Sequence, residues 1–140
     1  NQTYTYDADA GTVTATYGNA TAKAHADTLW TAQDETDGKG TEGEVATRGL
    51  KYNLIQTLKQ QVAGILSNTD WYITRNTEKS TAIPSAISTH RDAVRTKQAE
   101  METAITNASD TPALETLYTY TEQEDGSVTR PLGELPRLES

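Results

Sequence analysis

The sequence predicts an α+β fold, in which an N-terminal β-hairpin or small antiparallel sheet is joined to a helical hairpin or small helical bundle and an extended C-terminal tail. Three observations predict it. Apolar residues alternate with threonine near the N-terminus, they recur at helical spacing after residue 50, and proline and glycine interrupt the last ten residues. We therefore expect three regions: residues 1–49 with the hairpin, residues 50–117 with the helices, and residues 118–140 with a short hairpin and the tail.

The first 17 residues have the alternation that is typical of β-strands. Tyrosine, valine and alanine alternate with threonine on both sides of residues 7–11, where aspartates and Gly11 favour a turn. We expect a β-hairpin with aromatic side chains on one face and threonines on the other. Core packing is the simplest explanation for Tyr4, Tyr6 and Tyr17, and stacking on a carbohydrate is the alternative.

Residues 18–49 combine a candidate third strand with an acidic segment. The strand, residues 28–31, contains Trp30, which we expect to be exposed and which is therefore a candidate contact residue. Residues 34–44 contain no apolar side chain, so they cannot bury anything and we expect a loop or a mobile segment. Their acids partly fit the spacing of a calcium loop, but Gln33 stands where an aspartate is needed, which favours a solvated acidic loop.

The apolar period becomes helical between residues 50 and 66, where leucine, isoleucine and valine fall on one face of a helix. Gly64 lowers the stability of this helix by about 1 kcal/mol, which suggests that another element packs closely there. A second, short helix is expected to start at Asp70, because Asn68 and Thr69 are both good capping residues.

The longest helix is expected from Pro84 to about residue 107, because proline is tolerated at the first helical position. Apolar residues recur in it every seven positions, as in a short coiled-coil seam. The residues of this seam are Ile87, Val94, Met101 and Ala108, with Ile105 one turn beyond Met101. The seam either packs against the preceding helices of the same chain or contacts another protein.

The C-terminal region mixes short elements with an irregular tail. Pro112 is expected to open a short helix that ends at Leu117. Alternation resumes at residues 118–121, and Asp125 followed by glycine predicts a hairpin turn. The last ten residues contain two prolines, a glycine and three leucines, which predicts an extended arm that lies on a partner.

Composition excludes several classes of function. The formal net charge of −8 argues against nucleic acid and anionic membranes as partners. The chain has no cysteine and only two histidines, so we expect no metal, no cofactor and no catalytic residues, and we expect His90 on a helix surface. No stretch reads as a membrane span or secretion signal, and the start at Asn1 suggests that an initiator or short leader was removed.

Two aromatic residues and two arginines form the most informative pattern in the helical region. Trp71 and Tyr72 open the short helix, and Arg91 and Arg95 lie four positions apart on one face of the long helix. A guanidinium stacked on an exposed aromatic ring contributes about 0.5–1 kcal/mol. We therefore expect the segments to pack together, with Trp71 as an internal brace against Arg91 and Arg95.

This pattern also resembles a small module of tailed-phage virion proteins. In that family, a Leu-Leu-x-x-Thr-Asp-Trp segment is followed, after a variable stretch, by Thr-Tyr-Arg-x-Ala-Leu-Arg. The residues that carry the resemblance here are Ile65, Leu66, Thr69, Asp70, Trp71, Thr89, Arg91, Ala93, Val94 and Arg95. His90 stands in place of the family tyrosine, and the resemblance covers about residues 50–108.

The resemblance implies a non-enzymatic bacteriophage virion structural protein, associated with the tail, the baseplate or a tail fibre. It implies contacts with other virion proteins or a small homo-oligomer, and a location in the virion after assembly in the host cytoplasm. A low apolar content of 34% fits a chain that gains stability from neighbouring subunits. A capsid decoration protein and a tail-fibre assembly chaperone remain as alternatives.

Overall fold

The chain is a mixed α+β protein, as the sequence predicts, in a computed structural model that describes residues 2–18 and 22–139. The helices are α1 (Ala32–Thr36), α2 (Leu50–Ser67), α3 (Asp70–Lys79), α4 (Ser85–Asn107) and α5 (Thr111–Tyr118). The strands are β1 (Gln2–Asp7), β2 (Thr12–Tyr17), β3 (Thr28–Leu29), β4 (Val45–Thr47), β5 (Thr121–Glu122) and β6 (Val128–Thr129).

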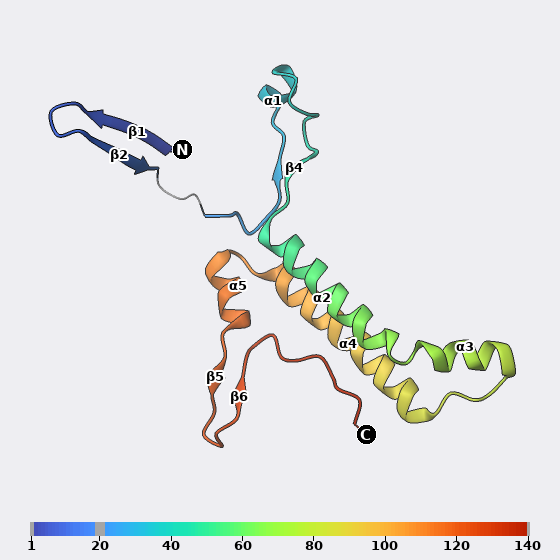
Figure 1. Ribbon diagram of the computed structural model, residues 1–140. Coiled ribbons are helices and arrows are strands. Elements are labelled where there is room, and N and C mark those ends of the chain that lie inside the picture. The colour runs from blue at the N-terminus through green and yellow to red at the C-terminus, as the bar shows by residue number, and fades with distance from the viewer. Residues whose placement is uncertain (1, 19–21, 140) are drawn as a thin grey trace.

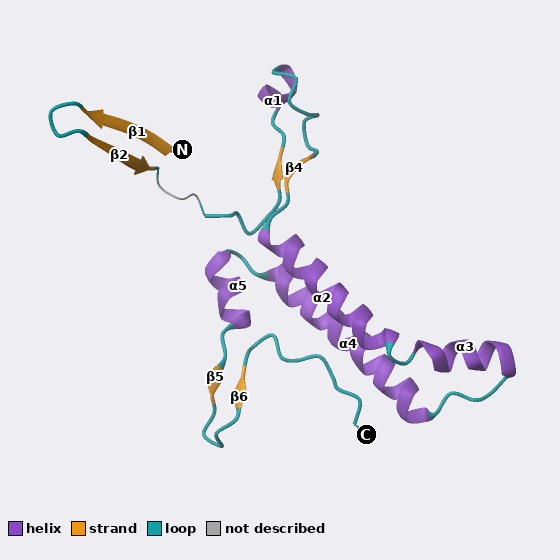
Figure 2. Cartoon of the chain, in the orientation of Figure 1, coloured by secondary structure: helices purple, strands orange, loops and turns teal. Residues whose placement is uncertain are grey.

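Two long helices form a spine from which three β-ribbons project (Figures 1 and 2). Helices α2 and α4 lie side by side and antiparallel, and α3 leaves the spine at the end where they are connected. Each ribbon is a separate antiparallel pair: β1 with β2, β3 with β4, and β5 with β6. The predicted third strand therefore exists, but it pairs with β4 and does not extend the N-terminal hairpin.

The core lies between α2, α4 and α5. Val94 and Ile105 on α4 are completely buried, and they belong to one cluster with Leu58 and Val62 of α2. Ile87 and Met101 are also buried. The heptad seam thus packs within the chain, and the interpretation of intrachain packing is the one that the structure supports.

The helix boundaries predicted from the sequence are confirmed to within a residue. Helix α4 begins directly after Pro84, and α3 begins at Asp70 after Thr69. The expectation at Gly64 is wrong, because a Cβ placed there would have no described atom within 4 Å apart from its own helix. The glycine faces open space, so it weakens the helix without allowing another segment of the described chain to approach.

The acidic segment is a loop over residues 37–44, as expected, but its first residues are helical. Residues 32–36 form α1, and Thr31 and Asp34 form a capping box at its start. The Asp34 carboxylate accepts hydrogen bonds from the Thr31 hydroxyl at 2.7 Å and from Lys39 Nζ at 3.0 Å. Hydrogen bonds rather than apolar burial organise this segment, which a search for apolar residues cannot detect.

The C-terminal tail lies on its own chain, so the prediction of an arm on a partner is wrong for its first half. Leu132 is buried in the core cluster, and its N–H donates to the Leu117 carbonyl at 3.0 Å. Leu135 packs against the same cluster. The leucines bury apolar surface on the helices, which is sufficient reason for the irregular backbone to follow them. Among the helices of residues 2–18 and 22–139, none is long and apolar enough to cross a membrane.

Candidate interaction surfaces

The β1–β2 hairpin has one apolar face, and that face is uncovered. Its register pairs Tyr4 with Ala15, Tyr6 with Val13 and Gln2 with Tyr17, so these residues share one face and the threonines share the other. The three tyrosines and Val13 are each 64–72% exposed. The predicted separation of aromatic and threonine faces is confirmed, but the expectation that a core covers the tyrosines is wrong.

Helix α3 carries an aromatic and cationic cluster, which consists of Trp71, Tyr72 and Arg75. The two rings stack with centroids 3.8 Å apart, and the Arg75 guanidinium lies 4.8 Å from the Trp71 ring and 5.4 Å from the Tyr72 ring. Trp71 is 50% exposed. The predicted brace of Trp71 with Arg91 and Arg95 is therefore wrong, because Arg75 of the same helix is the cation at its ring.

Arg91 instead fastens the corner between α2 and α3. Its Nη1 donates to the Leu66 carbonyl at 2.8 Å and to the Thr69 hydroxyl at 2.7 Å, and it lies 2.9 Å from the Asp70 carboxylate. The Leu66 carbonyl also accepts from the Thr69 N–H at 3.1 Å and the Thr69 hydroxyl at 3.1 Å, so the buried guanidinium joins a hydrogen-bonded corner and adds a charge-assisted bond to it. Arg95 is exposed and lies 3.3 Å from Asp92.

Trp30 lies at the tip of the β3–β4 ribbon and is half-buried, which corrects the expectation of an exposed tryptophan. The backbone N–H of Trp30 donates to the Glu44 carbonyl at 2.9 Å, and its backbone carbonyl accepts from the Gly43 N–H at 3.0 Å. A Cβ at Gly40 would overlap the indole ring, so the chain passes over the ring only because residue 40 is glycine. The tryptophan thus closes the ribbon on itself.

Charged groups hold this ribbon and its junction with the spine. The hydrogen bonds of the Thr31 hydroxyl and N–H, followed by that of Lys39, lower the pKa of Asp34 from 3.8 to about 2. At the other end of the ribbon, Asp27 accepts from the Gly49 N–H at 2.7 Å and pairs with Arg48 at 2.7 Å. The Gly49 hydrogen bond, and then Arg48, lower the pKa of Asp27.

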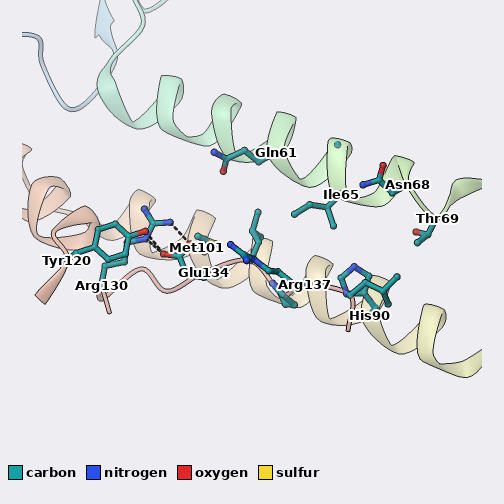
Figure 3. A pocket seen from close by; sticks show the side chains of 14 residues that line it. Gln61, Ile65, Asn68, Thr69, His90, Met101, Tyr120, Arg130, Glu134 and Arg137 are labelled. Atoms are coloured by element: carbon teal, nitrogen blue, oxygen red, sulfur yellow. Dashed lines mark hydrogen bonds and ion pairs between the residues drawn. The ribbon is translucent and has the colours of Figure 1, made fainter. Parts of the chain in front are cut away.

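A groove of about 820 Å³ lies between α2, α4 and the C-terminal tail (Figure 3). Gln61 and Ile65 line it from α2, Asn68 lines it just after the end of that helix, and His90 and Arg137 line its other side. His90 is only 8% exposed, which corrects the expectation of a helix-surface residue. The lining mixes amides, aliphatic side chains and charged groups.

One end of the groove is closed by a polar cluster. The Tyr120 hydroxyl donates to the Glu134 carboxylate, and Arg130 Nε lies 3.0 Å from the same carboxylate. The hydrogen bond to Glu134 raises the pKa of Tyr120, and desolvation raises it further. The cluster joins the β5–β6 ribbon to the tail and so fixes the position of the groove wall.

The acids that partly fit a calcium loop have other partners. Glu35 accepts from the Glu42 N–H at 3.1 Å, and Asp37 lies 3.2 Å from Lys39. Within residues 2–18 and 22–139, no group of three or more histidine, aspartate or glutamate side chains is placed to hold a metal ion.

Sequence reasoning missed Arg75, although a signal for it was present. Arg75 is four positions after Trp71 and three after Tyr72, so helical spacing alone places it beside both rings. The role of Gly40 had no such signal, because it depends on how the ribbon folds back over Trp30.

Comparison of the chain with protein-family models, curated proteins and solved structures finds no match.

Proposed function

We propose that this chain is a non-enzymatic structural protein of a bacteriophage virion, a tail, baseplate or fibre-associated component that acts through protein–protein contacts. The observation that carries the proposal is the uncovered aromatic face of the β1–β2 hairpin. A two-stranded hairpin is marginally stable in water unless its apolar face packs on something. A face of this kind is expected in a chain whose fold is completed within an assembly.

The α3 cluster supports the same proposal. Tryptophan, tyrosine and arginine are the residues most enriched among those that dominate binding energy at protein interfaces. Here the three occur within five positions on a helix that extends from the spine, with Trp71 half exposed (Figure 1). Stacking holds the rings in place before any partner arrives, which reduces the entropy lost on binding.

The virion context comes from the resemblance in residues 65–95. The structure gives part of that motif a packing role, since Arg91 contacts Thr69 and Asp70 of the Thr-Asp-Trp segment. These contacts hold the corner between α2 and α3, and in the proposed assembly the exposed face of α3 contacts a neighbouring protein.

Immunogold labelling of intact phage particles with an antibody against this chain tests the proposal. We expect gold at the tail or baseplate, and none on particles treated with the preimmune serum. Gold over the head would overturn the tail location in favour of a capsid decoration protein. No labelling, together with absence of the chain from purified virions by mass spectrometry, would overturn the virion role in favour of an assembly chaperone.

A further inference from the structure

We propose that the apolar face of the β1–β2 hairpin packs against the same face of a second copy of this chain, around a two-fold axis. This inference rests on the proposed assembly role and names the partner of one of its surfaces. Three features of the hairpin support it: the sizes of its paired side chains, its charge and its exposed area.

On the apolar face of the hairpin, the two side chains of each cross-strand pair differ in size. Tyr6 lies opposite Val13, Tyr4 lies opposite Ala15, and Tyr17 lies opposite Gln2. The two tyrosines of the first two pairs are on β1, and the smaller residues are on β2. One side of the face is therefore raised and the other is hollow over most of its length.

A two-fold axis parallel to the strands makes this face complementary to itself. Such an axis places β1 of one copy over β2 of the other, as in the face-to-face packing of two sheets. Tyr4 and Tyr6 of each copy then lie over Ala15 and Val13 of its partner. A flat or evenly large face would not select a second copy in this way, because its tyrosines would meet tyrosines.

The hairpin strands also offer two copies of an acidic chain a surface without charge repulsion. The chain carries a formal net charge of −8, whereas residues 2–6 and 12–17 contain no charged side chain. Asp7 lies opposite Thr12 on the threonine face, and its carboxylate accepts from the N–H groups of Asp9 and Ala10. The face that would be buried is therefore uncharged.

The area of the face is sufficient for a weak but specific contact. A tyrosine buries about 150–250 Å² when it is wholly covered, and roughly two-thirds of that is still available on each ring. Six tyrosines from two copies then supply about 600–1,000 Å², and Val13 and Ala15 add to this. The sum approaches the lower limit of about 1,200 Å² for specific interfaces, so we expect micromolar dissociation.

Strand edges offer another route to self-association, but it leaves the tyrosines exposed. The outer edges of β1 and β2 lack the proline and lysine residues that commonly protect an edge. Edge-to-edge pairing would satisfy backbone groups that water already satisfies, whereas face-to-face packing removes apolar surface from water. The two arrangements differ in which side chains matter, and this difference makes the proposal testable.

Sedimentation velocity of the purified 140-residue chain across about 1–200 μM tests the contact. We expect a concentration-dependent dimer that is not weakened by 0.5 M NaCl, because the face is uncharged. Tyr4→Ser with Tyr6→Ser should weaken the dimer, raising its dissociation constant by about tenfold or more. The matched control, Thr3→Ser with Thr5→Ser, changes the opposite face of the same strand and should leave it unchanged, and Tyr4→Phe with Tyr6→Phe should retain the dimer.

A chain that stays monomeric at 200 μM would overturn the inference, as would a dimer that survives the double serine variant. Circular dichroism of that variant shows whether the helical spine is intact. The result is separable from the proposed function. Gold on particles with a monomeric chain would leave the virion role standing, and a dimer absent from virions would leave the contact standing without the virion role.

Discussion

The helical spine and the N-terminal hairpin both carry a regular apolar pattern, and they use it differently. In α4 the seam residues Val94 and Ile105 are completely buried against α2, whereas in the hairpin Tyr4 and Tyr6 remain about two-thirds exposed. A pattern of period seven or two specifies which side of an element is apolar. It does not specify what covers that side.

The connections explain the difference. Helices α2 and α4 are joined through α3, and each presents a long apolar face to its neighbour. The hairpin is followed by residues 18–27, which contain alanine, polar and charged residues but no large apolar side chain. A segment of this composition has little that would dock the hairpin onto the spine, so the tyrosine face is left for another surface.

The spine and the hairpin should differ most in how much unfolding free energy is lost when one apolar side chain is truncated. We expect Ile105→Ala to lower the free energy of unfolding by about 2–5 kcal/mol, because the side chain is fully enclosed. Tyr6→Ala should change it by less than about 1 kcal/mol in dilute, monomeric protein, since little of its packing is lost. Urea unfolding followed by circular dichroism at 222 nm measures both, and equal losses would contradict the division into a packed spine and an uncovered hairpin.

Arg91 and Arg95, which lie four positions apart on α4, should also differ in how much each contributes to stability. Arg91→Ala should destabilise the spine by about 1–3 kcal/mol, because the Leu66 carbonyl and the Thr69 hydroxyl lose a buried donor. Arg95→Ala is the matched control on the same helix, and an exposed pair of its kind contributes at most about 1 kcal/mol. The same urea experiment checks both, and a larger loss for Arg95→Ala would refute the role assigned to Arg91.

Gly40→Ala tests whether the β3–β4 ribbon packs on its own tryptophan. A Cβ at residue 40 overlaps the Trp30 ring, so we expect a local strain of about 1–3 kcal/mol that displaces the indole. The emission of Trp30 should shift to longer wavelength in a Trp71→Phe background. The helical melt should not change, and an unchanged emission maximum would show that the ring is not held beneath residue 40.

Gly64→Ala should stabilise the chain, in contrast to Gly40→Ala, which should strain it. The site is helical and open, so alanine gains helix propensity and we expect a stabilisation of about 0.5–1 kcal/mol. Thermal unfolding of the purified chain measures it. A destabilised variant would mean that a further segment approaches α2 at this point.

The smallest effect concerns pH and is confined to the ribbon. The folded-state pKa of Asp34, about 2, lies below its usual value of 3.8, so its contribution to stability is present above pH 4 and is lost as the pH falls toward 2. Trp30 emission in the Trp71→Phe background should therefore change in this range. Asp34→Asn should remove that transition, and a transition that persists in the variant would assign it to another carboxylate.

Most elements could be predicted from the sequence because their signals are local. The starts of α3 and α4, the turn at Gly11 and the turn at Gly126 follow from capping and turn residues within a few positions. Candidate surfaces were harder to predict. Trp71 was correctly recognised as a residue that stacks on an arginine, but the partner was wrong, because the choice between Arg75 and Arg91 depends on the angle between α3 and the spine.

The sequence by itself determined the four helices from α2 to α5, the acidic composition and the two faces of the hairpin, because each depends on residues close together in the chain or on composition. Only the tertiary structure decided that the heptad seam is internal, that Leu132 returns the tail to the core and that the tyrosines stay uncovered. Burial depends on which elements meet, and that is set by the total apolar surface removed from water rather than by any local pattern.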